Sequence, residues 1–206
     1  MSRPLLPGVI AMAALVVGSN ILVQFLFGDW LTWGAFTYPF VFLVTDLVNR
    51  LHGADAARKV VLAGFATGLA CSFIGTQIEG AFGPLVTLRV ALASGTAFLI
   101  AQLTDVAIFD RLRAGVWWKA PLVSSIIGGT IDTALFFTIA FSAGLIWIAP
   151  SVDVAWANEA VPVLGIGPVA PLWVSLGIAD LTVKLALALL ALAPYRRALS
   201  IFLRGA

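Results

Sequence analysis

Six charged side chains interrupt the apolar runs of this 206-residue chain, and each of them would be costly to surround with lipid. They are Asp46, Arg89, Asp105, Asp132, Asp180 and Lys184. A carboxylate near the centre of a bilayer costs on the order of 3 kcal/mol, so such groups usually face a cavity, a partner or a ligand. These residues are therefore the first candidates for function.

The spacing of the charged residues suggests partners for some of them, because residues three, four or seven apart lie on one side of a helix. Asp180 and Lys184 form an i, i+4 pair, which is either a neutralising ion pair or part of a functional site. Asp46 and Arg50 have the same spacing near the end of an apolar run. Asp132 has no basic residue nearby on its own helix, so it needs a partner from another helix, a proton or a ligand.

Uncharged polar and aromatic residues converge on the same helix faces. Asn20 and Gln24 share one face, and Gln102 pairs with Asp105 on another. A stripe with Asp46 at its edge consists of Tyr38, Phe42, Thr45 and Asn49. A face of small residues that allows a neighbouring helix to approach closely consists of Ser125, Gly128 and Gly129, followed by Asp132.

Residues 33–39, Trp-Gly-Ala-Phe-Thr-Tyr-Pro, place Gly and Pro at the edge of a short apolar run. One interpretation is a broken helix whose free backbone groups bind a ligand. The other is a proline that begins a helix. The sequence leaves both open.

The machinery of membrane enzymes is missing from the sequence. The only histidine, His52, stands beside Gly53 in a short connection, which excludes a Ser–His protease dyad, an H-E-x-x-H zinc site and a Cys/His metal cluster. No Gly-x-x-x-x-Gly-Lys-Ser/Thr loop is present, so the chain does not hydrolyse ATP by itself. We therefore predict that the chain is not an enzyme and uses no cofactor or metal.

The elements that hold these residues follow from the composition. Apolar residues make up 61% of the chain and charged residues 11%, and the mean hydropathy is +1.06, which indicates a chain surrounded by lipid. Apolar runs predict transmembrane helices at 8–27, 36–51, 59–78, 85–109, 120–148 and 170–193. The sequence thus predicts an all-α polytopic membrane protein with six transmembrane helices in a single domain, 1–206. The fifth run is longer than a bilayer requires, and the Pro-rich segment 149–169 is expected on the outer surface.

Lys and Arg residues alternate between the connections. They lie before the first span, in the second and fourth connections and in the tail, whereas the charged residues of the other three connections are all acidic. By the positive-inside rule both termini are cytoplasmic. The same bias explains the isoelectric point of about 9.0, so we predict no nucleic-acid partner. Only Arg89 and Lys184 remain inside the bilayer.

Taken together, these residues resemble the queuosine precursor transporters, also called the vitamin uptake transporter family. The resemblance covers nearly the whole chain. It is carried by 19–24 (SNILVQ), 32–50 (TWGAFTYPFVFLVTDLVNR), 102–113 (QLTDVAIFDRLR), 117–121 (WWKAP), 125–128 (SIIG) and 132–141 (DTALFFTIAF). It implies a multi-pass protein of the bacterial inner membrane that imports 7-cyano-7-deazaguanine and 7-aminomethyl-7-deazaguanine for salvage into the tRNA base queuosine.

The implied substrate suggests roles for the polar residues. Its adjacent N1–H and 2-amino donors fit one carboxylate, that of Asp132 or Asp46. Its flat ring would stack on Tyr38, Phe40 or Phe42, while Asn20, Gln24, Gln102 or Arg89 would address its carbonyl or its 7-substituent. The full set of candidate substrate-binding residues is Asn20, Gln24, Tyr38, Phe40, Phe42, Asp46, Asn49, Arg89, Gln102, Asp105, Asp132, Asp180 and Lys184.

We predict secondary transport, with proton coupling through an intramembrane acid and facilitated diffusion both open. Two alternatives remain. One is a substrate-binding membrane subunit for a vitamin-like solute that needs a separate energising module, and the other is a membrane scaffold that transports nothing. The expected partners are the lipid bilayer and the 7-deazaguanine, and the sequence leaves a homo-oligomer open.

Overall fold

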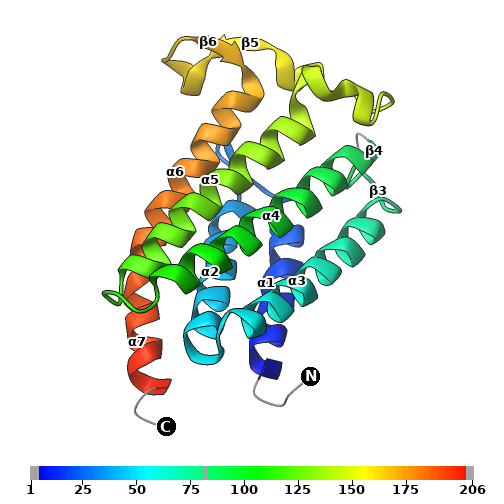
Figure 1. Cartoon of the computed structure of the whole chain (residues 1–206). Coiled ribbons are helices and arrows are strands. Elements are labelled where there is room, and N and C mark those ends of the chain that lie inside the picture. Colours follow the sequence, from blue (N-terminus) through cyan, green and yellow to red (C-terminus); the bar gives the residue numbers. More distant parts are fainter. Residues whose placement is uncertain (1–4, 81–82, 203–206) are drawn as a thin grey trace.

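The structure of the protein is a computed structural model that describes residues 5–80 and 83–202. Its helices form an elongated bundle (Figure 1). They are α1 (Leu6–Leu22), α2 (Gly34–His52), α3 (Ala54–Gly75), α4 (Leu88–Leu112), α5 (Lys119–Phe141), α6 (Leu172–Leu190) and α7 (Leu192–Phe202). The six predicted runs correspond in order to α1 through α6.

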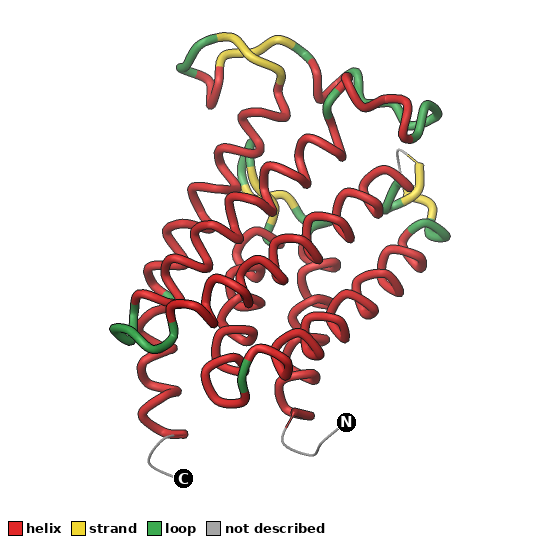
Figure 2. The backbone as a smooth tube through the Cα atoms, viewed as in Figure 1, coloured by secondary structure: helices red, strands yellow, loops and turns green. Residues whose placement is uncertain are grey.

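Strands occur in the described residues only as short antiparallel hairpins between helices (Figure 2). They are β1 (Leu26–Phe27) with β2 (Leu31–Thr32), β3 (Glu79–Gly80) with β4 (Gly83–Pro84), and β5 (Ala160–Pro162) with β6 (Val169–Pro171). Three 3-10 turns complete the loop before α6: η2 (Ala143–Ile148), η3 (Trp156–Asn158) and η4 (Val163–Gly165). The segment 149–169, predicted to lie on the outer surface, is therefore folded into turns and a hairpin at the end of the bundle away from the termini.

Several of these helices are suited to cross a bilayer. α3, α4, α5 and the continuous stretch Leu172–Ile201 are long and apolar enough, and α1 is a shorter apolar helix. α2 carries buried polar residues and packs against each of the helices α1, α3, α4, α5 and α6, so its polar groups face protein. The chain is an all-α polytopic membrane protein, as predicted.

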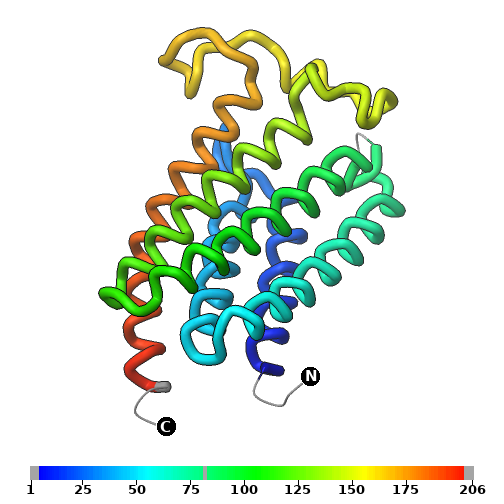
Figure 3. Tube along the Cα trace, in the orientation of Figure 1, coloured from blue at the N-terminus to red at the C-terminus, as the bar shows by residue number. Residues whose placement is uncertain are grey.

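The two ends of the chain lie at the same end of the bundle (Figure 3). The basic second and fourth connections meet there, because the Arg50 guanidinium donates to the carbonyl of Arg113 and Arg113 Nη1 donates to the carbonyl of Asn49 at 3.4 Å. Positive charge is therefore concentrated at this end, which is the cytoplasmic one by the positive-inside rule.

α2 begins at Gly34 and continues through Pro39, so it is not broken there and the proline does not begin it. Gly34 is needed because a Cβ at this position would lie 3.1 Å from the Cα of Val23. The Thr37 hydroxyl donates to the Gly34 carbonyl at 2.8 Å, so this hydroxyl finds its acceptor within the first turn of α2. The segment from Gly34 to Pro39 therefore brings the start of α2 against the end of α1.

The largest differences from the predicted runs are at the ends of α5 and α6, while α1 ends and α3 begins five residues earlier than predicted. α5 ends at Phe141, where the chain turns into η2, because the Arg89 side chain of α4 binds the carbonyls of Ile139 and Ser142 at this end. α7 lies beyond the last predicted run. Its residues Tyr195 and Leu199 pack against Phe109 and Ala120, which explains why the chain remains helical after α6.

The small-residue face of α5 allows the close packing that its sequence predicted. A Cβ on Gly128 would lie 2.7 Å from Cε1 of Phe42 and 3.3 Å from the carbonyl oxygen of Ala101. α5 therefore approaches both α2 and α4 at this level, and its packing against α4 is the most extensive in the bundle.

Candidate functional site

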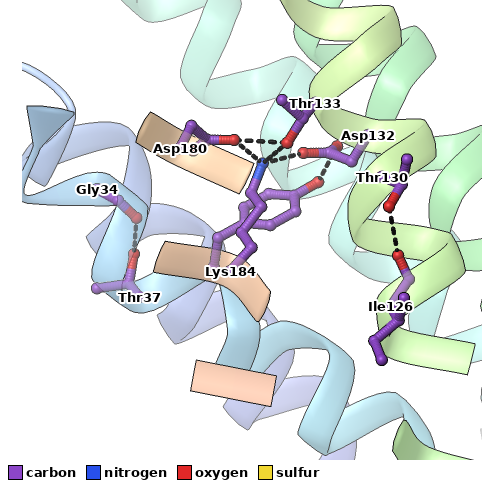
Figure 4. Close-up of polar contacts among 9 residues, drawn as sticks. Gly34, Thr37, Ile126, Thr130, Asp132, Thr133, Asp180 and Lys184 are labelled. Atoms are coloured by element: carbon purple, nitrogen blue, oxygen red, sulfur yellow. Dashed lines mark hydrogen bonds and ion pairs between the residues drawn. The ribbon is translucent and has the colours of Figure 1, made fainter. Parts of the chain in front are cut away.

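Lys184 lies at the centre of a cluster of polar groups from α5 and α6 (Figure 4). Its Nζ is 2.6 Å from Asp132 Oδ2, 2.6 Å from Asp180 Oδ2 and 3.1 Å from Thr133 Oγ1. The Thr133 hydroxyl donates to Asp180 Oδ2 at 2.6 Å. The i, i+4 ion pair of Asp180 and Lys184 is thus formed, and Asp132 finds its partner on another helix.

Tyr38 adds α2 to this cluster. Its hydroxyl donates to Asp132 Oδ1 at 2.7 Å, and its ring lies beneath Lys184 with the ammonium 4.8 Å from the ring centroid. A cation over an aromatic face is stabilised by the ring quadrupole. Each oxygen of Asp132 therefore has a donor, and the Lys184 ammonium is held from several sides. We call Tyr38, Asp132, Thr133, Asp180 and Lys184 the Lys184 cluster.

The Lys184 cluster has more negative than positive charge when its groups are ionised. One ammonium faces two carboxylates, so a negative charge remains. Among the described residues, no hydrogen-bond donor reaches Asp180 Oδ1. The cluster can therefore accept further hydrogen bonds or a positive charge.

A cavity of about 490 Å³ extends from the outer hairpins to the Lys184 cluster. Leu31, Thr32 and Trp156 line its outer end, and Asp132, Asp180 and Lys184 form its floor. Its aromatic lining consists of Trp30, Tyr38, Phe65, Phe98, Phe136, Phe137, Phe141 and Trp156. Apolar walls with a few polar groups are typical of small-molecule sites, and the volume lies in their usual range of about 300 to 1,000 Å³.

The structure brings part of the predicted set to this cavity. The members that line it are Asn20, Gln24, Tyr38, Asp132, Asp180 and Lys184. The Asn20 amide donates to the Val16 carbonyl at 2.9 Å, which leaves its carbonyl oxygen free to turn toward a ligand. Phe40 does not line the cavity, and 42% of its surface is exposed on the outside of the bundle.

The other members of the predicted set lie below the cavity, toward the cytoplasmic end, except for Arg89. They are Phe42, Asp46, Asn49, Gln102 and Asp105, and all of them are buried. Gln102 Oε1 accepts a hydrogen bond from the Thr45 hydroxyl at 2.7 Å, and Asn49 Nδ2 donates to the Val106 carbonyl at 3.0 Å. The two amide side chains of this set, Gln102 and Asn49, therefore both join α2 to α4.

Asp46 and Arg50 do not form an ion pair among the described residues, although their spacing allows one. Arg50 turns to the Arg113 carbonyl instead. Asp46 Oδ1 accepts a long hydrogen bond of 3.4 Å from Ser124. Asp46 also lines a second, small cavity of about 20 Å³, together with Phe42, Ser125, Lys184 and Tyr195.

Arg89 has a different setting from the other predicted residues. It is fully buried, and it donates to the carbonyls of Ile139 at 2.6 Å and of Ser142. A cation is favourable at the carboxyl end of a helix, where backbone carbonyls lack partners. Arg89 thus completes the end of α5, and it does not line the large cavity.

Sequence analysis missed several residues of the cavity. Thr133 joins Asp180 to Lys184, and Phe136 and Phe137 form part of the wall. Phe136 lies one helical turn after Asp132 and therefore shares its face, and this spacing is the signal that could have identified it. Phe65 and Phe98 carry no comparable signal, because an apolar residue in an apolar run faces lipid or protein equally well.

Comparisons with known proteins extend over most of the chain. A family model described as "Putative vitamin uptake transporter" matches residues 32–198. The chain is 37% identical over 155 residues to the "Queuosine precursor transporter" of Escherichia coli (strain K12), which covers 68% of this chain and 67% of that protein. No solved structure matches the chain.

Two further relatives carry the same kind of name. The chain is 40% identical over 121 residues to the "Probable queuosine precursor transporter" of Haemophilus influenzae, covering 53% of this chain and 52% of that protein. It is 30% identical over 190 residues to the protein of that name from Bacillus subtilis (strain 168), covering 82% and 72%. The family model includes every residue of the Lys184 cluster, so the comparisons and the site concern the same helices. The chain is a transporter rather than an enzyme, and it is a multi-pass protein of the bacterial inner membrane. It belongs to the vitamin uptake transporter family, and the relatives above are named queuosine precursor transporters or probable ones.

Proposed function

We propose that the chain imports the queuosine precursors 7-cyano-7-deazaguanine and 7-aminomethyl-7-deazaguanine by secondary transport, as one six-helix unit. The observation that carries the proposal is an aromatic cavity of about 490 Å³ with an ammonium and two carboxylates on its floor. The names of the relatives support the substrate class.

The polar edge of a 7-deazaguanine matches the floor of the cavity. This edge presents a carbonyl acceptor next to two donors, N1–H and the 2-amino group. The three N–H groups of the Lys184 ammonium bind Asp132, Asp180 and Thr133, so the ammonium gives up its contact with Thr133 to donate to the carbonyl. Asp180 Oδ1 and the Asp132 carboxylate supply acceptors for the two N–H groups. An adenine-like edge would place a donor against Lys184, so guanine-like rings are favoured.

The walls of the cavity provide for the rest of the substrate. The flat ring stacks on Tyr38 or Phe136, since aromatic rings favour offset or edge contacts. The 7-substituent points toward the outer end, where Asn20 and Gln24 lie. The excess negative charge of the Lys184 cluster favours the cationic aminomethyl group over the neutral cyano group when the two compete.

Rescue of queuosine tests the proposal. A host that cannot synthesise the precursors, supplied with limiting 7-cyano-7-deazaguanine, should regain queuosine in its tRNA when it expresses the wild-type chain. Asp132→Asn should abolish rescue, because it removes a carboxylate from the floor. The matched control is Asp153→Asn, an exposed acid of the outer loop, which should rescue fully.

Two outcomes would contradict the proposal. One is full rescue by Asp132→Asn at normal expression, which would remove the carboxylate from substrate binding. The other is no rescue by the wild-type chain when its presence in the membrane is verified. Uptake by the purified protein alone in liposomes would exclude the need for a separate energising module, and stabilisation of the purified protein by a 7-deazaguanine would exclude a scaffold.

A further inference from the structure

A second group of carboxyls lies below the Lys184 cluster. Asp46 of α2 and Asp105 of α4 lie where these two helices pack, between the bond of Thr45 to Gln102 and the bond of Asn49 to Val106, with 1% and 0% of their residue surfaces exposed. Ser124 and Ser125 of α5 face this pair. We call Asp46 and Asp105 the acid pair.

The acid pair lacks the partners that buried carboxylates require. Neither oxygen of Asp105 has a hydrogen-bond partner among the described residues, and the Ser124 hydroxyl reaches Asp46 only at 3.4 Å. No ion pair between described residues includes either acid. Two adjacent carboxyls in such a setting cannot both ionise, because their charges repel and lack water. One hydrogen held between the two carboxyls would supply the donor that they lack.

The surrounding helices bring no free cation to the acid pair. Arg50, one turn away on α2, binds the Arg113 carbonyl, and Lys184 of α6 is held by Asp132 and Asp180. α5 contributes only the hydroxyls of Ser124 and Ser125, and α7 contributes the Tyr195 phenol. The described faces of α1 and α3 that pack here belong to an apolar core.

A small cavity beside the acid pair and the large cavity share Lys184 in their linings. The small cavity of about 20 Å³ has room for a single water, since a water needs about 10 to 15 Å³ of such space. Its lining includes Asp46, Ser125 and Lys184. Lys184 also forms the floor of the large cavity, so this side chain is in contact with both spaces.

We propose that Asp46 and Asp105 form a proton-binding site that couples substrate import to proton entry. A proton arriving from the outer side through the small cavity binds one carboxylate and is shared by hydrogen bonding with the other. It returns to water on the cytoplasmic side when the inner end of the bundle opens. This inference rests on the proposed function, because it supplies the energy for import.

Infrared titration of the purified protein tests the shared proton without any substrate. The wild-type spectrum should show the C=O band of a protonated carboxyl that disappears as the pH is raised. Asp46→Asn and Asp105→Asn should each shift the frequency and the titration of this band, since the proton is shared by both acids. The double substitution should remove the band, and Asp153→Asn should retain it unchanged. A wild-type protein without the band, or a band that survives both substitutions, would overturn the proposal.

Transport by the purified protein in liposomes tests the coupling. With acid outside, the wild type should accumulate 7-cyano-7-deazaguanine above the external concentration. Asp105→Asn should exchange internal for external substrate at the wild-type rate but should lose accumulation, so that its concentration ratio falls to about one. Asp105→Glu, which keeps a carboxyl, should restore part of the accumulation.

The outcomes separate this inference from the proposed function. Full accumulation by Asp105→Asn, loss of exchange together with accumulation, or accumulation driven by a sodium gradient and not by a pH gradient would each overturn the proton site. If the wild type moves no 7-deazaguanine in either direction, the proposed function fails, while the infrared titration still decides whether the acid pair holds a proton.

Discussion

Two groups of carboxyls are buried along the interior of the bundle, and they differ in what balances their charge. In the Lys184 cluster an ammonium contacts both acids at 2.6 Å, and hydroxyls of Tyr38 and Thr133 complete the contacts. In the acid pair no cation is in contact, and Asp105 has no donor from the described chain. The acids of the first group are bound by an ammonium and two hydroxyls of the protein. The acids of the second group need a hydrogen that the described protein groups do not donate.

This difference assigns different chemistry to the two regions. Fixed donors and acceptors beside an aromatic cavity can recognise the edge of a solute, because their positions are held by neighbouring helices. An unpartnered pair of acids recognises little beyond a proton, because its needs are met by one hydrogen. Recognition and energy coupling would thus be separated by about two helical turns along α2, from Tyr38 to Asp46.

The largest effect is expected from removing the ammonium of the Lys184 cluster. Lys184→Met leaves the buried Asp132 and the partly buried Asp180 without a cation, and breaking a buried ion pair costs about 3 to 5 kcal/mol. The variant should melt well below the wild type in detergent and should lose uptake. Lys119→Met, at an exposed position at the start of α5, should change neither property.

A compensating variant separates charge balance from packing. Lys184→Met combined with Asp132→Asn and Asp180→Asn removes all three charges, so melting should return toward the wild-type temperature while uptake stays lost. If Lys184→Met alone melts like the wild type, the view that this region is held by its ion pairs is wrong.

The next effect concerns α5, which contributes to both regions. Gly128 lies between Ser124, which faces the acid pair, and Asp132, which faces Lys184. Gly128→Ala places a methyl group 2.7 Å from the Phe42 ring, and overpacking of this kind costs about 1 to 3 kcal/mol. Gly129→Ala is the matched control, because its new methyl group would lie at an ordinary distance of 3.9 Å from Cβ of Lys184.

We expect Gly128→Ala to lower the melting temperature and the uptake rate, and Gly129→Ala to leave both nearly unchanged. Melting curves in detergent and initial uptake rates measure the two effects. Equal behaviour of the two alanine variants would show that α5 can shift away from α2 and α4 without cost, and that it does not hold the two regions in register.

Much of the fold follows from the sequence because two simple signals agree. Apolar runs mark the helices, and the alternation of Lys and Arg fixes their direction. The path of α2 did not follow, since Gly34 acts there through contact with Val23, which local sequence does not reveal. The end of α5 was also hidden, because it depends on Arg89 of another helix.

The site was predictable where its partners share a helix. The pair Asp180 and Lys184 follows from spacing, but the contact of Tyr38 with Asp132 joins residues 94 positions apart. Periodicity gives the face of a helix and says little about depth, so the sequence left either Asp46 or Asp132 as the carboxylate for the substrate. The structure places them at different levels, beside different partners.

The smallest expected effect concerns the aromatic wall, where the implied substrate suggested Phe40 as a stacking partner and the structure points to Phe136. Phe136 lines the large cavity, whereas Phe40 is exposed on the outside of the bundle. Loss of one aromatic contact costs about 1 kcal/mol, so Phe136→Leu should raise the KM for uptake about fivefold. Phe40→Leu removes an equal amount of ring surface and should leave KM unchanged. If the two substitutions raise KM equally, the ring of the substrate does not contact Phe136 in the wall of the large cavity. The substrate would then be recognised outside this cavity.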